Sequence, residues 1–269
     1  MTTLAIAGWR VRLDCSLPVV DAAVAAHFRA FVVPDDAAND AWVTVSLDPD
    51  VPAVSLPVFR ATRQRDSCLL DMPGIRGIID INSLQGTARL GRRGLRLNIE
   101  FFLKALFAYM AFSHGGLLLH CSGVLSGREA YLFTGEGGSG KSTVVSLLPH
   151  RLALNDDMVV LRPDGRGWRA YGTPFWNVET TRRCGQTADG RVAGIYRLAQ
   201  DQQVYLEPMA NAVAISELIA NCPVVNTDPV ALPALMNRCR ELAETVKLQR
   251  LHFRKSADFW PLLHAGNTE

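Results

Sequence analysis

The sequence lacks the features that mark several common classes of protein. No long run of like charges occurs among its 28 basic and 26 acidic residues, and the formal net charge is +2. Composition therefore gives no argument for a nucleic-acid partner, which requires clustered positive charge. The six cysteines are scattered without a CxxC pair or another zinc-type spacing. We expect them to be reduced, mostly buried thiols.

Long apolar segments are also missing. The most apolar helix candidate, residues 101–112, is interrupted by Lys104 and is shorter than the roughly 20 residues that span a bilayer. Residues 1–9 have neither the basic start nor the continuous apolar core of a secretory signal. We therefore expect a cytoplasmic protein without a membrane partner.

The pattern of the sequence changes near residue 98. Residues 1–98 contain short β-branched runs separated by Pro, Asp, Asn and Gly, which predict a β-rich accessory region. A helix capped by Asn98 is expected to end near Ser113. Residues 99–269 then alternate strands and helices, which predicts a largely parallel α/β core with a C-terminal helical extension.

The predicted elements follow from periodicity and turn residues. In the accessory region, strands are expected at residues 3–12, 41–47 and 77–81. In the core, strands are expected at residues 117–120, 130–134, 153–161, 168–171, 192–198, 204–206 and 247–253. Helices are expected at residues 140–148, 212–220 and 233–245.

One motif carries specific chemistry. Residues 135–142 read Gly-Glu-Gly-Gly-Ser-Gly-Lys-Ser and match the phosphate-binding pattern GxxxxGK[ST]. An ordinary glycine-rich turn is the alternative, but the apolar strand before the motif and the helix after it favour a phosphate loop. Lys141 is expected to pair with the β- and γ-phosphates of ATP, and Ser142 to ligate Mg²⁺. The expected nucleotide-binding residues are Gly135, Glu136, Gly137, Gly138, Ser139, Gly140, Lys141, Ser142 and Thr143.

Two adjacent acids follow the motif. Asp156 and Asp157 lie between apolar residues of one predicted strand, where uncompensated charge is costly. Neighbouring side chains of a strand point to opposite sides, so we expect the two carboxylates to have separate roles. A solvated turn is the alternative. His120 ends another apolar run, and by itself a histidine there is more often structural than catalytic.

Together these residues resemble the HPr kinase/phosphorylase family and its shorter kinase-like relatives, whose core is similar to that of phosphoenolpyruvate carboxykinases. The resemblance covers roughly residues 117–161 and is carried by His120 with residues 122–124, by the loop at 135–143 and by residues 155–159. It implies an α/β fold with a P-loop kinase core and a β-rich N-terminal region. It also implies an enzyme that transfers the γ-phosphoryl group of ATP to a serine-type hydroxyl with the help of Mg²⁺.

The resemblance also implies roles for individual residues. Asp156 is similar to the family's general base, and His120 to the residue that assists or orients it. Asp157 would bind Mg²⁺ beside Ser142, while Lys141 would stabilise charge on the transferred group. The better-known relatives assemble into rings, so a homo-oligomer is compatible with the sequence.

The acceptor is expected to be a peptide or small protein with a serine hydroxyl. Residues 171–176, 194–198 and 259–260 look like those of relatives found beside peptide-modification genes. Met158 stands where the family has an arginine, which favours such an acceptor over HPr itself.

Several other residues have both a functional and a structural interpretation. Arg182 and Arg183 could supply a cation to the phosphoryl group, and Glu179 could be a further metal ligand, but an ordinary surface turn is favoured. Trp168, Trp176 and Tyr171 could stack on a substrate, but a place in the core is favoured.

Two alternatives to a kinase stay open. The first is a P-loop ATPase or a nucleotide-dependent peptide-binding accessory protein, because a phosphate loop does not choose between water and an alcohol. The second is a relative that holds nucleotide without chemistry. Retention of Lys141, Ser142, Asp156 and His120 argues against the second.

Overall fold

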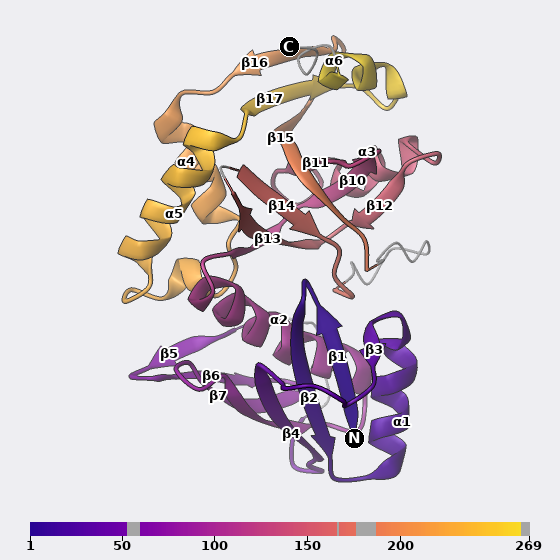
Figure 1. The fold of residues 1–269 in the computed structure, drawn as a ribbon, viewed down its shortest axis with the longest axis vertical. Coiled ribbons are helices and arrows are strands. Elements are labelled where there is room, and N and C mark those ends of the chain that lie inside the picture. The colour runs from indigo at the N-terminus through magenta and orange to yellow at the C-terminus, as the bar shows by residue number, and fades with distance from the viewer. Residues whose placement is uncertain (53–59, 166, 176–186, 265–269) are drawn as a thin grey trace. The chain divides into compact units, whose positions relative to one another are not determined.

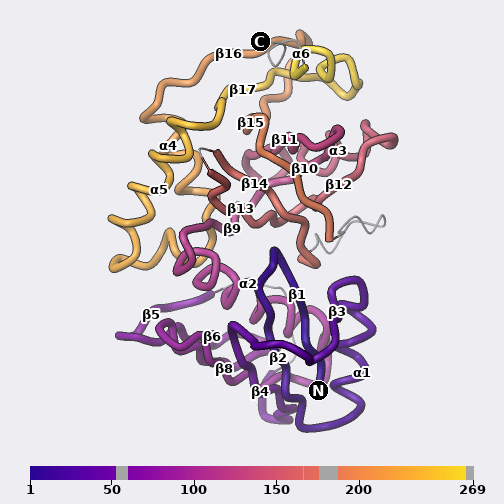
Figure 2. The backbone as a smooth tube through the Cα atoms, in the orientation of Figure 1, coloured from indigo at the N-terminus to yellow at the C-terminus, as the bar shows by residue number. Residues whose placement is uncertain are grey.

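The computed structural model divides the chain into two compact units, Met1–Ser113 and His114–Glu269. It describes residues 1–52, 60–165, 167–175 and 187–264. Figures 1 and 2 draw the elements and the backbone path of each unit. The boundary at Ser113 places the helix that we expected at the start of the core in the first unit instead.

The first unit is a mixed sheet with helices against it. Its strands are β1 (Thr2–Ile6), β2 (Trp9–Cys15), β3 (Val32–Val33), β4 (Ala41–Leu47), β5 (Thr62–Gln64), β6 (Ser67–Met72), β7 (Ile75–Asp80) and β8 (Gln85–Leu90). Its helices are α1 (Pro18–His27), the 3-10 turn η1 (Arg29–Phe31) and α2 (Leu95–Ser113). The strand order is β3-β1-β2-β4-β8-β7-β6-β5.

Helix α2 belongs to this unit because it packs on β7 and β8. A Cβ atom at Gly77 or Gly86 would lie 2.8 or 2.7 Å from the ring of Phe102, so glycine at both positions lets the helix approach the sheet. The helix begins before Asn98, whose buried amide donates to the carbonyl of Arg93 at 3.0 Å. The prediction of an Asn98 N-cap was therefore wrong, because this side chain donates to the preceding turn.

The predicted strand at residues 3–12 is a hairpin. β1 and β2 pair antiparallel, and the turn between them has positive φ at Ala7 (54°) and Gly8 (82°). A two-residue turn of this kind matches the twist of a hairpin. The sequence did not reveal this turn, because alanine occupies its first position and only its second position carries the expected glycine.

The second unit is built on a larger mixed sheet. Its strands are β9 (Leu117–His120), β10 (Ser122–Ser126), β11 (Glu129–Thr134), β12 (Leu152–Asn155), β13 (Met158–Asp164), β14 (Gly167–Tyr171), β15 (Asp189–Gln200), β16 (Tyr205–Pro208) and β17 (Leu248–Phe253). Its helical elements are α3 (Lys141–Leu147), α4 (Asn211–Ala220), η2 (Val225–Thr227), α5 (Leu232–Thr245), η3 (Ala257–Phe259) and α6 (Trp260–His264). The main path runs β12-β10-β11-β15-β14-β13-β9, and β17 joins β15 and β16 (Figure 2).

Parallel pairing in the described part of this sheet joins β11 to β15 and β15 to β17, while the other pairs are antiparallel. The expected α/β class is therefore observed, but the sheet is less parallel than predicted because short turns close the hairpins β10–β11 and β13–β14. The carboxyl ends of β11, β15 and β17 meet at one edge. In open sheets with parallel strands, this edge is where ligands bind.

An apolar cluster packs α3 and the C-terminal helical turn against the strands that meet at this edge. It joins β11, α3, β15, β17 and the C-terminal helical turn through side chains that are almost fully buried. Its largest members are Tyr131, Phe133, Tyr196, Phe253 and Phe259. Because aromatic side chains bury large areas, the cluster fixes α3 against the strands.

The length of the helices and the state of the cysteine thiols can both be compared with the sequence analysis. Within the described ranges, no helix combines the length and the apolar character needed to cross a membrane. The described cysteines, which are Cys15, Cys68, Cys121, Cys222 and Cys239, are all free thiols.

Candidate functional site

The glycine-rich loop lies between β11 and α3, as the motif requires. Gly135, Gly138 and Gly140 have φ values of 141°, 78° and 106°, which L-amino acids with side chains rarely adopt. At Gly140, an added Cβ would also lie 2.6 Å from Cζ of Phe253. The sequence therefore needs glycine here both for the backbone conformation and for close packing on β17.

Lys141 opens α3 and turns its side chain back into the loop. Its buried ammonium donates to the carbonyl oxygens of Gly135 at 2.7 Å and Glu136 at 3.2 Å. Burial lowers the pKa of Lys141, and the carboxylate of Asp157 opposes that shift. These two carbonyl groups accept hydrogen bonds from the ammonium but carry no net charge. The centre of the loop therefore retains a positive potential, which favours an anion.

The paired aspartates lie at a bend between two strands, not within one strand as predicted. Asn155 causes the break: its side-chain oxygen accepts from the backbone N–H groups of Asp157 at 2.7 Å and Met158 at 2.9 Å. Its amide also donates to the carbonyl of Thr173 at 2.8 Å. This buried turn sends β12 to pair with β10, and β13 to pair with β9 and β14. Asp156 is 2% exposed, so it is not part of a solvated turn.

His120 lies beside Asp157. Its Nε2 is 3.2 Å from Oδ1 of Asp157, and its backbone N–H donates to the carbonyl of Asn221 at 2.7 Å. The sequence interpretation had linked His120 to Asp156, whereas the ion pair in the structure is with Asp157. The reason is the register of β9 against β13, which sets His120 opposite Met158, next to Asp157.

Two charged residues that we did not single out from the sequence approach the loop. Arg197 on β15 has Nε 2.9 Å from Oε2 of Glu217 on α4, and Nη2 3.7 Å from Oε1 of Glu136. An arginine within the apolar strand at residues 192–198 was the available signal. The sequence alone could not show that this arginine lies at the loop. Arg197 is placed beside Thr134, the last residue of β11, by the parallel register of β11 and β15.

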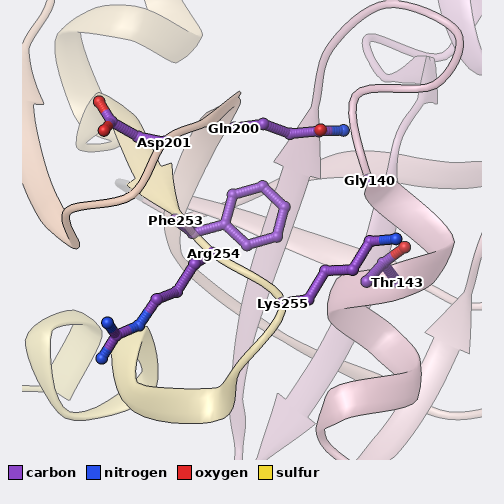
Figure 3. A pocket seen from close by; sticks show the side chains of 7 residues that line it. All are labelled: Gly140, Thr143, Gln200, Asp201, Phe253, Arg254 and Lys255. Carbon is purple, nitrogen blue, oxygen red and sulfur yellow. The ribbon is translucent and has the colours of Figure 1, made fainter.

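A hollow of about 190 Å³ lies beside the first turn of α3, where Gly140 and Thr143 line it (Figure 3). Its lining residues are Gly140, Thr143, Gln200, Asp201, Phe253, Arg254 and Lys255. The Lys255 side chain extends toward Thr143, and Gln200 points toward the loop, where its amide donates to the carbonyl of Gly138 at 2.8 Å. The hollow thus joins the ends of β15 and β17 to the phosphate loop.

A magnesium ion fits the donor chemistry of the predicted ligands. Within the residues that the structure describes, no group of three or more His, Cys, Asp or Glu side chains gathers as a metal cage. Mg²⁺ at a phosphate loop does not use such a cage, because phosphates and waters supply most of its ligands. Ser142 and the partly exposed Asp157 offer the hydroxyl and carboxylate oxygens that this ion prefers.

Some sequence expectations fall elsewhere. Trp176, Glu179, Arg182 and Arg183 lie outside the described residues. Trp168 is 4% exposed, which confirms its predicted place in the core.

Comparison with known proteins finds distant structural likeness among solved structures. No family model matches the chain, and no curated protein matches it. Among solved structures, the chain is similar to the Hpr(Ser) kinase/phosphatase from Coxiella burnetii, with 10% sequence identity and a TM-score of 0.32. The match covers 55% of this chain and 91% of that chain. The structural relationship is therefore distant.

Proposed function

We propose that the protein is a kinase that transfers the γ-phosphoryl group of ATP to a serine-type hydroxyl on a peptide or small protein. The observation that carries the proposal is the buried Lys141, whose ammonium donates to neutral carbonyls inside a loop of positive-φ glycines, within electrostatic range of the Asp157 carboxylate. Main-chain N–H groups, one ammonium and a helix start together suit the phosphates of a nucleotide.

The loop would orient the nucleotide along its length. Lys141 would contact the β- and γ-phosphates, which places the γ end near Gly135 and Glu136. The nucleoside would then lie toward Thr143, where the hollow of Figure 3 offers space for a base or ribose. Lys255 would add positive charge on this side.

The carboxylates would divide the chemistry. Asp156 accepts the hydroxyl proton while the serine oxygen forms a bond to the γ-phosphorus. The bond between that phosphorus and the β–γ bridging oxygen breaks, and ADP leaves with the electron pair. Asp157 and Ser142 would hold Mg²⁺, which supplies positive charge to the phosphate oxygens. His120 fixes the orientation of Asp157 through their 3.2 Å contact.

The test is transfer to serine-containing peptides incubated with protein, ATP and Mg²⁺, followed by mass spectrometry. Acceptor-stimulated ADP formation is expected. Asp156→Asn should lower the transfer rate by about 10²- to 10⁴-fold and change nucleotide affinity little. Asp164→Asn, at an exposed carboxylate of β13, is the matched control and should have no effect.

Two outcomes would contradict this assignment. Transfer at the parental rate by Asp156→Asn would show that Asp156 is not the base. ATP turnover that is independent of every acceptor would favour the second candidate, an ATPase that uses the same loop to activate water.

A further inference from the structure

Arg197 lies where a second cation could reach the nucleotide. In the register of β11 and β15, it is the partner of Thr134, which directly precedes the glycine loop. Its side chain is partly exposed, and its guanidinium reaches the loop residue Glu136. The fold therefore holds an arginine at the entrance of the loop.

The two contacts of Arg197 are unequal. The Nε contact with Glu217 is 2.9 Å long, and the mostly buried Glu217 carboxylate also accepts from the Asn221 amide at 3.0 Å. The Nη2 contact with Glu136 is 3.7 Å long, and the Glu136 side chain is 89% exposed. Exposed pairs of this kind contribute little. Nε of Arg197 is nevertheless a buried donor for which the described residues provide no hydrogen bond, so the pair with Glu217 holds the side chain by charge and proximity. The end of the guanidinium near Glu136 is held more weakly.

Lys141 and Arg197 both contact the first residues of the glycine-rich loop, directly after β11. The ammonium of Lys141 donates to the carbonyls of Gly135 and Glu136, and Arg197 contacts the Glu136 side chain. Burial lowers the pKa of Lys141, and the carboxylate of Glu217 is among the charges that oppose this shift, so the Arg197–Glu217 pair lies within electrostatic range of Lys141. Since Lys141 marks the β/γ end of a bound triphosphate, Arg197 borders the γ-phosphate position.

Space for an incoming group is open beside Arg197. A hollow of about 440 Å³ lies between β15 and α4. It is lined by Arg197, Ala212, Val213, Ser216, Glu217 and Ala220. A phosphate oxygen or an acceptor can therefore approach the guanidinium without displacing the core.

We propose that Arg197 is a catalytic residue that binds the γ-phosphate, and this inference rests on the proposed function. When the triphosphate binds, the guanidinium exchanges the exposed Glu136 carboxylate for a γ-phosphate oxygen, and the ion pair with Glu217 is retained. The charge then stabilises the oxygens of the phosphoryl group during transfer. Without nucleotide, the Glu136 carboxylate therefore takes the position at the guanidinium that a γ-phosphate oxygen takes in the complex.

The proposal predicts a difference between ATP and ADP, measured by calorimetry in Mg²⁺. Arg197→Ala should weaken ATP binding by about 10- to 100-fold and leave ADP binding within about threefold, because ADP lacks the γ-phosphate. Arg197→Lys should restore part of the ATP affinity, since it keeps the charge and loses the fork. Glu136→Gln should strengthen ATP binding severalfold by removing the competing carboxylate.

Arg250→Ala is the matched control. Arg250 is the register partner of Arg197 on β17 and pairs with Glu207 at 2.8 Å, so its removal should leave both affinities unchanged. Equal loss of ATP and ADP in Arg197→Ala, or no loss of either, would overturn the proposal. If Arg197→Ala does not fold, unchanged ATP affinity in both Arg197→Lys and Glu136→Gln would overturn it. Failure of the parental protein to bind either nucleotide would instead refute the proposed function, and this inference with it.

Discussion

The two units both bury charged side chains, but they satisfy these charges in different ways. In the first unit, the carboxylate of Glu100 on α2 lies 3.2 Å from Nζ of Lys104 and 3.2 Å from Nε2 of His27. In the second unit, the ammonium of Lys141 donates to neutral loop carbonyls. A buried charge that is paired within the fold makes each partner necessary to the fold, because loss of either leaves the other uncompensated. A charge held by carbonyls stays able to attract an outside anion.

This difference assigns stability to one cluster and binding to the other. Removing one member of a buried ion pair leaves an uncompensated charge, which is strongly destabilising. Lys141 forms no ion pair with the residues that the structure describes, so its removal should cost the fold little. Substitutions in the two clusters should therefore separate a loss of stability from a loss of binding.

Glu100→Ala should have the largest effect, because it leaves Lys104 and His27 without their shared carboxylate. We expect a loss of about 3–5 kcal/mol in the free energy of unfolding, measured with urea. Asp71→Ala, at an exposed pair with Arg76 in the same unit, should change it by no more than about 0.5 kcal/mol. Binding of Mg²⁺–ATP by the folded fraction should be unchanged. A cost below about 1 kcal/mol for Glu100→Ala would contradict the contrast.

Gly140→Ala should come next, since it combines a strained backbone with a clash against Phe253. We expect a loss of about 2–5 kcal/mol in the thermal or urea stability of the second unit. Gly138→Ala is matched in having positive φ but meets no atom within 4 Å, so it should cost about 1–2 kcal/mol. Equal losses in the two variants would show that the packing of Gly140 on β17 does not matter.

His252→Phe should have the smallest effect, and that effect should depend on pH. His252 contacts Asp201 at 3.0 Å and Glu207 at 3.2 Å and stacks on Tyr205. A backbone N–H from Gln203 and the His252 contact lower the pKa of Asp201, and His252 lowers that of Glu207.

The sign of the pH dependence follows from those lowered carboxyl pKa values. Their contribution to stability is present above the unfolded pKa values of 3.8 and 4.5, and it is lost as the pH falls through the lower folded values. The urea midpoints of the parental protein and His252→Phe should therefore converge below about pH 4. A gap that widens as the pH falls below the unfolded carboxyl values of 3.8 and 4.5 would refute this assignment.

Much of the candidate site could be predicted because its signals are local. A phosphate loop is fixed by consecutive residues and by the strand and helix around it, and the structure has β11, the loop and α3 in that order. Trp168 was likewise identified as a core residue from its surroundings. The use of the loop to bind ATP stays a prediction.

The rest of the site depends on contacts between distant segments. The bend at Asn155 forms because its amide finds Thr173, and the predicted strand at residues 153–161 could not show that partner. Arg197 reaches the loop through the pairing of β15 with β11, which periodicity does not specify. The hairpin at Ala7 was hidden because alanine rarely adopts positive φ.

Calorimetric titration of the protein with ATP, with and without Mg²⁺, would show whether the glycine-rich loop binds a nucleotide. We expect Mg²⁺-dependent binding that Lys141→Ala weakens by about 100-fold, while the free energy of unfolding changes by less than about 1 kcal/mol. Lys247→Ala, at an exposed lysine before β17, should bind like the parental protein. Absence of Mg²⁺-dependent affinity in the parental protein, or parental affinity in Lys141→Ala, would contradict the account.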